Sequence, residues 1–112
     1  MSKMDTATVL ARLESIIADR SDAGNADKSY TATLLAGGRE KCARKFGEEA
    51  IELVLASVSD DRDHVTAEAA DVLFHMLVVL RASNVPLEAV INELAGRFQQ
   101  SGLDEKASRT AG

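Results

Sequence analysis

Apolar residues recur along most of the chain at the spacing of three and four positions that places side chains on one face of a helix. Between residues 5 and 18 this spacing predicts a first helix, with Asp5 or Thr6 as its N-cap. The apolar face of this helix is formed by Val9, Leu10, Leu13, Ile16 and Ile17. Residues 19–29 are polar and contain glycine, which predicts a loop after the helix.

Three longer helices are predicted after a short helical turn at residues 32–36. That turn meets Gly37 and Gly38, where the missing side chains allow the chain to bend sharply. The apolar periodicity places the longer helices over residues 39–57, 64–82 and 87–99. Four helices joined by short connections, with no internal repeat, predict an all-α fold resembling a four-helix bundle.

Capping residues mark the ends of the last two helices. Asp63 is a candidate N-cap for the helix over residues 64–82, and Asn84 can end it. Pro86 suits the first turn of the last helix, because its fixed backbone angle is already helical. The apolar positions of this last helix, which we expect to face inward, are Leu87, Val90, Ile91, Leu94 and Phe98.

Length and composition agree with these predictions. With 112 residues the chain has the size of one domain, so we expect a single domain over residues 1–112 with a polar tail from about residue 101. Hydrophobic residues make up 46% and charged residues 28%, as in ordinary soluble proteins. The single Pro and the 4% of aromatic residues favour helices over strands.

Charge and cysteine usage exclude several classes of protein. The formal charge is −5, and the basic residues are dispersed among acidic ones, so we expect no nucleic-acid partner. Cys42 is the single cysteine and cannot form an internal disulfide. The most apolar stretch, residues 72–80, is interrupted by His75 and is too short to span a bilayer. The N-terminus lacks a signal-peptide pattern, so we expect a cytoplasmic protein.

A dense group of charges lies on the helix over residues 39–57. Glu48 and Glu52 are four positions apart, and Glu49 stands one step around the same side, so the three carboxylates share a face. Lys41 and Lys45 precede them on the same helix. Such a face can hold a metal ion and a phosphate together. The alternative is an ordinary solvated face, with the lysines paired to the glutamates.

Acidic residues also interrupt the helix over residues 64–82. Glu68, Asp71 and His75 follow one another at spacings of three and four, whereas the positions from 69 to 80 are otherwise apolar nearly all round. We expect a helix of this kind to be buried. Unpaired carboxylates in a buried helix would be strongly destabilising, so something must compensate them.

A hard divalent cation can supply that compensation. Magnesium prefers carboxylate and water oxygens and is often bridged to substrate phosphates. Zinc is disfavoured because the chain has two histidines and one cysteine. We therefore predict Mg²⁺, with Mn²⁺ as a substitute. The predicted ligands, which are also the catalytic candidates, are Glu48, Glu49, Glu52, Glu68 and Asp71.

These motifs resemble a known superfamily. The pattern Gly47-Glu48-Glu49-x-x-Glu52, followed by Glu68-x-x-Asp71, is similar to the metal motif of the all-α nucleoside-triphosphate pyrophosphohydrolases. The surrounding sequence resembles the phosphoribosyl-ATP pyrophosphatase family. It comprises residues 29–32, Gly38, Lys41 and Lys45 before the glutamates, then residues 68–75 and the tail over residues 101–109.

The resemblance implies hydrolysis of 1-(5-phosphoribosyl)-ATP to 1-(5-phosphoribosyl)-AMP and pyrophosphate, the second step of histidine biosynthesis. The five carboxylates would place magnesium against the triphosphate and against a water near the α-phosphorus, and one of them would act as general base. Lys41 and Lys45 are candidates for phosphate contacts. Ser29 and Tyr30 are candidates for substrate contacts, although Ser29 can equally cap the short helix. His75 would support a metal ligand, unless it is simply a core histidine with its hydrogen bonds satisfied.

A homodimer is expected, because a helix with apolar residues on all sides needs more cover than three short neighbours give. The family resemblance implies the same. Two rival functions remain at this point. The chain can be a pyrophosphohydrolase of the same superfamily that acts on a canonical or damaged nucleoside triphosphate. It can also be a noncatalytic helical dimerisation module whose acidic face binds a basic partner protein.

Overall fold

The computed structural model describes residues 4–22 and 29–99, and within these ranges the chain forms five helices and no strand. The helices are α1 (Thr6–Asp22), α2 (Tyr30–Ala36), α3 (Gly38–Ser57), α4 (Arg62–Ala82) and α5 (Leu87–Gln99). The predicted all-α fold is therefore confirmed. Residues 23–28 of the predicted loop and the tail from residue 101 lie outside the described residues.

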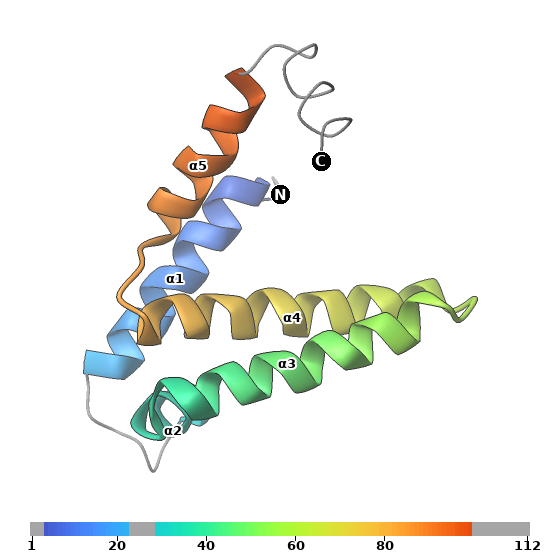
Figure 1. The fold of residues 1–112 in the computed structure, drawn as a ribbon, viewed down its shortest axis with the longest axis horizontal. Coiled ribbons are helices and arrows are strands. Elements are labelled where there is room, and N and C mark those ends of the chain that lie inside the picture. The colour runs from blue at the N-terminus through green and yellow to red at the C-terminus, as the bar shows by residue number, and fades with distance from the viewer. Residues whose placement is uncertain (1–3, 23–28, 100–112) are drawn as a thin grey trace, which may run out of the picture.

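The long helices α3 and α4 lie side by side and run antiparallel (Figure 1). A short acidic turn joins them, and the carboxylate of Asp61 accepts the backbone N–H of His64 at 3.1 Å. Asp61 is thus the N-cap of α4, and the prediction that Asp63 has this role is wrong. Asp63 lies instead in the first turn of α4, where a negative charge still favours the helix dipole.

The ends of α1 and α2 follow from capping by side chains. The Asp5 carboxylate accepts the backbone N–H of Thr8 at 2.7 Å, which confirms Asp5 as a cap and lowers the pKa of its carboxyl group. At its other end α1 continues to Asp22, so residues 19–22 are helical rather than part of the predicted loop. The hydroxyl of Ser29 accepts the backbone N–H of Ala32 at 3.0 Å, and α2 therefore begins two residues before its predicted start.

Two glycines allow α2 and α3 to meet almost without a connection. Gly38 has a φ of 89°, a left-handed conformation that favours glycine, and it opens α3. At Gly37 a Cβ atom would overlap the aliphatic stem of Lys41. The sharp bend predicted from the two glycines is therefore present at this junction.

Each of the described helices contributes to one small core. The buried side chains are Ile17 from α1, Leu34 from α2, Cys42 from α3, Leu77 and Val78 from α4, and Leu87 from α5. Full burial of a large aliphatic side chain contributes roughly 1.5–3 kcal/mol to folding. The thiol of Cys42 donates to the Leu34 carbonyl oxygen at 3.3 Å, and burial raises its pKa. Cys42 is therefore an inert core residue.

The connection between α4 and α5 is fixed by local hydrogen bonds and by α1. Asn84 has a φ of 58° and follows the last turn of α4, where a left-handed residue commonly ends a helix. The Val85 N–H donates to the Leu80 carbonyl oxygen at 2.9 Å, which closes that turn. At the start of α5, a carboxylate oxygen of Glu14 accepts the backbone N–H of Leu87 at 2.7 Å.

Beyond this connection, α5 points away from the α3–α4 pair (Figure 1). Of its apolar side chains, Leu87 is buried and Val90 is partly buried, whereas Ile91, Leu94 and Phe98 are exposed. The prediction that all five face inward is wrong for these last three, because no other described helix packs extensively along α5. Within the described residues, no helix combines the length and the apolar character needed to cross a membrane.

Candidate metal centre

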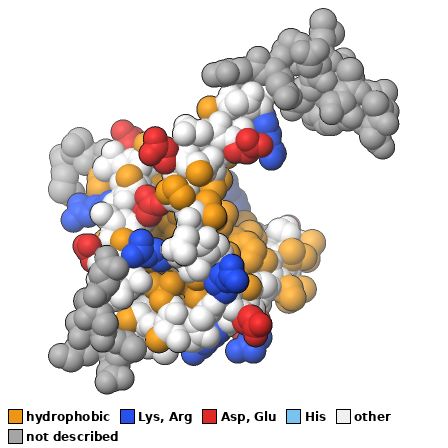
Figure 2. Space-filling view, turned by 60° about the vertical axis from the view of Figure 1, so that its left-hand side comes forward, with side chains coloured by type: hydrophobic (Ala, Val, Ile, Leu, Met, Phe, Trp, Pro, Cys, Tyr) orange, Lys and Arg blue, Asp and Glu red, His pale blue; other side chains and the backbone are white. Residues whose placement is uncertain are grey.

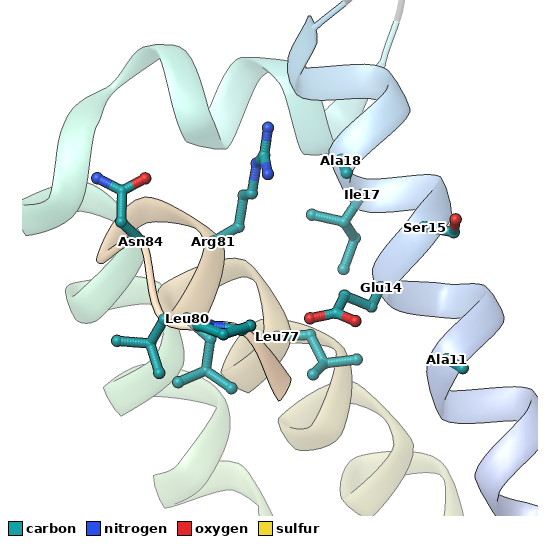
Figure 3. A pocket seen from close by; sticks show the side chains of 11 residues that line it. Ala11, Glu14, Ser15, Ile17, Ala18, Leu77, Leu80, Arg81 and Asn84 are labelled. Carbon is teal, nitrogen blue, oxygen red and sulfur yellow. The ribbon is translucent and has the colours of Figure 1, made fainter. Parts of the chain in front are cut away.

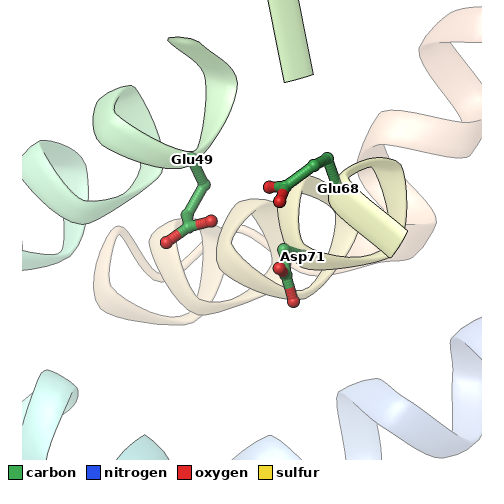
Figure 4. Close-up of side chains that lie close together, drawn as sticks. All are labelled: Glu49, Glu68 and Asp71. Atoms are coloured by element: carbon green, nitrogen blue, oxygen red, sulfur yellow. The ribbon is translucent and has the colours of Figure 1, made fainter. Parts of the chain in front are cut away.

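Three acidic side chains from two helices meet at the α3–α4 contact. Glu49 projects from α3 towards Glu68 and Asp71, which lie one turn apart on α4 (Figure 4). One carboxylate oxygen from each of the three lies within 4.8 Å of the others. The antiparallel packing of α3 and α4 therefore brings together residues that are 19 or more positions apart in the sequence.

This geometry fits a hard divalent cation. Oxygen ligands around an octahedral Mg²⁺ lie at about 2.1 Å from the ion, so two ligands are at most about 4.2 Å apart. The three carboxylate oxygens lie within 4.8 Å of one another, which is near the separation that such an ion requires. All three offer oxygen, and neither sulfur nor imidazole is part of the group. The donor set therefore suits magnesium or manganese better than zinc.

The exposure of these carboxylates differs from the expectation. Glu49 and Glu68 are partly buried, but Asp71 is exposed, and Leu73 on the same helix is 43% exposed. The prediction that α4 is buried on all sides is thus wrong within a single chain, because α1 and α3 cover only part of it. A cation would therefore stabilise this group mainly by offsetting the mutual repulsion of three clustered negative charges, and less by compensating their desolvation.

Glu48 and Glu52 lie beside this group on α3 but are not part of it. A carboxylate oxygen of Glu48 accepts from the Lys45 ammonium group at 3.1 Å. This hydrogen bond raises the pKa of Lys45, with smaller contributions from the charge of Glu48, from Tyr30 and from Glu49. The ion pair between lysine and glutamate that the sequence left open is therefore present for Lys45. Glu52 is exposed.

His64 is a neighbour of the centre that sequence reasoning missed. Its Nε2 atom lies 3.4 Å from a carboxylate oxygen of Glu68, one turn further along α4. The side chain of Glu68 is 18% exposed, whereas that of His64 is 49% exposed. The spacing of four positions between the two residues was the available signal.

His75 is buried next to the centre with both ring nitrogen atoms bonded, as in the core-histidine alternative that the sequence left open. Its Nδ1 atom lies 2.8 Å from the backbone oxygen of Asp71, and its Nε2 atom lies 3.0 Å from the Tyr30 hydroxyl. The ring is also edge-on to Phe74, with the ring centroids 5.0 Å apart. His75 thus connects α2 to the turn of α4 that carries Asp71. Ser29, the other candidate in this region, is the N-cap of α2.

A separate cavity of about 360 Å³ lies where α1 meets the end of α4 and the connection to α5 (Figure 3). Apolar side chains such as Ile17 and Leu77 line it together with Glu14, Arg81 and Asn84. The Glu14 carboxylate is engaged with the N-terminus of α5. None of the three clustered carboxylates lines this cavity. The candidate chemistry therefore lies at the α3–α4 contact.

Most of the chain is similar to one known protein family. A family model described as phosphoribosyl-ATP pyrophosphohydrolase matches residues 10–98. The chain belongs to this family. The match covers α2, α3 and α4 completely, and with them every candidate site residue named above. Membership of the phosphoribosyl-ATP pyrophosphohydrolase family confirms the resemblance found in the sequence motifs.

Curated relatives carry the name phosphoribosyl-ATP pyrophosphatase. The protein of Rhizobium johnstonii is 59% identical over 100 residues, which cover 89% of this chain and 92% of that protein. The protein of Dinoroseobacter shibae is 56% identical over 102 residues, which cover 91% and 99%. The protein of Allorhizobium ampelinum is 51% identical over 106 residues, which cover 95% and 100%. The similarity therefore extends over nearly the whole length of these family members.

Proposed function

We propose that this protein hydrolyses 1-(5-phosphoribosyl)-ATP to 1-(5-phosphoribosyl)-AMP and pyrophosphate, the second step of histidine biosynthesis. The observation that carries the proposal is the group formed by Glu49, Glu68 and Asp71, which lies inside the segment that matches the family. The names of the relatives support the same reaction. A biosynthetic reaction on a highly charged nucleotide would take place in the cytoplasm.

In this proposal Glu49, Glu68 and Asp71 hold Mg²⁺ through carboxylate oxygens, with Mn²⁺ as a substitute. The metal supplies charge neutralisation at the triphosphate and lowers the pKa of a coordinated water. Glu48 and Glu52 extend the carboxylate row along α3 on either side of Glu49. A carboxylate of the five that is not used as a ligand accepts the proton of the attacking water.

The reaction requires water to attack the α-phosphorus while the bond to the bridging oxygen of pyrophosphate breaks. Lys41 and Lys45 lie on α3 before the glutamates, at the end of the helix that faces α2. Each ammonium group can neutralise a phosphate oxygen as a point charge. Lys45 then exchanges its bond to Glu48 for one to the substrate. Tyr30 and Ser29, at the start of α2, complete the proposed substrate-binding side.

The active form in this proposal is a homodimer. The apolar stripe of α3 is formed by Ile51, Val54 and Leu55 and continues to the C-cap residue Val58, with the three-and-four spacing of a helix contact face. These four side chains are between 60% and 84% exposed in the single chain. On the face drawn in Figure 2, hydrophobic side chains also lie at the surface between charged ones. A second copy of the chain that covers such surface would remove it from water.

A pyrophosphate-release assay over a panel of nucleotides tests the proposed substrate. We expect kcat/KM for 1-(5-phosphoribosyl)-ATP to exceed the values for ATP, dUTP and dCTP by at least about a hundredfold, because a second ribose phosphate adds several charged and polar contacts. A preference for dUTP or dCTP would instead assign the chain to another substrate of the superfamily. Absence of magnesium-dependent turnover on every nucleotide would favour the noncatalytic dimerisation module.

A further inference from the structure

Both ring nitrogen atoms of the buried His75 lie within hydrogen-bond distance of a partner, Nδ1 of the Asp71 backbone oxygen and Nε2 of the Tyr30 hydroxyl. The backbone oxygen of Asp71, 2.8 Å from Nδ1, can only accept a hydrogen bond, so Nδ1 carries a proton. His75 is 5% exposed. In a neutral imidazole one nitrogen carries the proton and the other a lone pair, so with the proton on Nδ1 the lone pair lies on Nε2.

This tautomer fixes the direction of the hydrogen bond to Tyr30. Because Nε2 can only accept, the Tyr30 hydroxyl donates its proton to Nε2 across 3.0 Å. The phenolic oxygen then has lone pairs left and no further proton to offer. The Tyr30 oxygen is therefore an acceptor for any other group that approaches it, and it cannot donate to a phosphate oxygen.

The ring of Tyr30 is held in place while part of the side chain stays accessible. It stacks on Phe74, with centroids 6.2 Å apart and an angle of 22° between the planes. It also meets His75 edge-on, with centroids 5.9 Å apart. The residue as a whole is 53% exposed. The side chain of Tyr30 is thus held by two ring contacts while part of the residue stays accessible, and a side chain held in this way loses little conformational entropy on binding.

Tyr30 also lies beside the candidate metal centre. Through His75 it is connected to the backbone of Asp71, one of the three clustered acidic residues. On its other side it lies close enough to Lys45 to contribute to the electrostatic field that raises the pKa of that lysine, after the larger effect of Glu48. Tyr30 is thus linked both to the carboxylate cluster and to Lys45, the two features that the proposed function assigns to nucleotide binding.

We propose that Tyr30 accepts a hydrogen bond from an O–H or N–H group of the nucleotide, a sugar hydroxyl or the base, and that His75 is the positioning residue that sets this polarity. The inference rests on the proposed function and deepens it. Tyr30 recognises the part of the substrate that is not phosphate, since phosphate oxygens offer no proton at neutral pH. The lysines of α3 recognise the phosphate part.

The test uses the full chain with Tyr30→Phe, His75→Phe, His75→Gln and the Tyr30→Phe/His75→Phe double variant. Tyr30→Phe keeps the stacking ring and removes the oxygen. We expect KM for 1-(5-phosphoribosyl)-ATP to rise about fivefold to tenfold, as for loss of one hydrogen bond, with kcat changed less than twofold. Magnesium affinity, measured by calorimetry without nucleotide, should stay within about twofold of wild type, since the phenol is not a metal ligand.

The histidine variants separate positioning from a merely structural role. His75→Phe removes the acceptor for the Tyr30 proton, so KM should rise by a similar factor and should not rise further in the double variant. His75→Gln restores an acceptor oxygen and should recover part of the affinity. Thermal unfolding of each variant establishes the temperature range in which it is folded, and the kinetic comparison is made within that range.

Substrates built on 2′-deoxy-ATP, on 3′-deoxy-ATP and on a purine without the exocyclic amine identify the donor. The analogue that lacks the contacted group should have the same KM with wild type and with Tyr30→Phe. An unchanged KM in Tyr30→Phe, or additive effects of the two substitutions, would overturn this inference while leaving the proposed function intact. Lack of turnover by the wild-type protein would instead overturn the proposed function itself.

Discussion

Replacing Glu49 with Gln, or Asp71 with Asn, is expected to lower kcat for 1-(5-phosphoribosyl)-ATP hydrolysis by a factor on the order of 10³. Each substitution removes one negative charge from a group whose oxygens lie within 4.8 Å of one another. A neutral amide binds a hard cation more weakly and stabilises less of the charge that develops at the triphosphate. Steady-state kinetics at saturating Mg²⁺ measure the loss.

Two comparisons make this result specific. Asp60→Asn, in the exposed turn between α3 and α4, is the matched control and should retain wild-type kcat, because Asp60 lies outside the cluster. Glu52→Gln should cause a smaller loss than Glu49→Gln, since Glu52 does not join the three clustered residues. Thermal unfolding should show no destabilisation in Glu49→Gln or Asp71→Asn, because each relieves repulsion between like charges. Full activity in both variants would remove these residues from the catalytic site.

Replacing Leu55 with Asp is expected to dissociate the proposed homodimer. Leu55 is 60% exposed in the single chain and lies in the middle of the apolar stripe of α3. In a symmetric dimer the substitution occurs twice, and each copy would bury an uncompensated carboxylate. The dimer Kd should rise by on the order of a thousandfold or more. Sedimentation equilibrium should then give the 11.9 kDa mass of one chain for the variant and twice that mass for the wild type.

The control for this experiment places the same charge elsewhere on the surface. Ala7 is exposed in the first turn of α1, where an added carboxylate also favours the helix dipole, so Ala7→Asp should remain dimeric. A wild-type protein that sediments as a single chain would contradict the dimer. So would a Leu55→Asp variant that stays dimeric at the same concentration, because the stripe would then lie outside the interface.

The helices were largely predictable because their signals are local. Pro86 and the apolar spacing after it placed the last helix at residues 87–99, which are the bounds of α5. Errors arose where several residues could serve the same role. Asp61 and Asp63 are both good caps, and the choice between them depends on which backbone N–H groups the folded turn presents. Because Ser29 caps α2, this helix begins earlier than predicted.

The site was predictable only in part, because it depends on tertiary packing. The spacing of three positions placed Glu68 and Asp71 on one face of α4. On α3, however, Glu48, Glu49 and Glu52 share one side of the helix, and only the rotation of α3 against α4 selects Glu49 as the member that meets the other two. Apolar patterning also overstated the burial of α4, since a pattern does not reveal whether the same chain or a second copy provides the cover.

Contacts between residues that are far apart in the sequence could not be predicted from local patterns. Tyr30 and His75 are separated by 45 positions, and neither has a pattern around it that indicates the other. Their hydrogen bond exists because α2 packs against α4, where His75 lies one turn after Asp71. The direction of that bond then follows from the chemistry of a neutral imidazole next to a carbonyl oxygen. The role proposed for Tyr30 therefore depends on the packing of α2 against α4, which no sequence pattern indicates.

We expect carboxylates from α3 and α4 together to bind a divalent cation. Isothermal titration calorimetry of the purified protein with MgCl₂, in the absence of nucleotide, measures this binding. Saturable binding is predicted for the wild type and for Asp60→Asn, and its loss is predicted for the Glu49→Gln/Asp71→Asn double variant. Wild-type protein that takes up no Mg²⁺ or Mn²⁺, or a double variant that binds as tightly as the wild type, would show that Glu49 and Asp71 do not form a cation site.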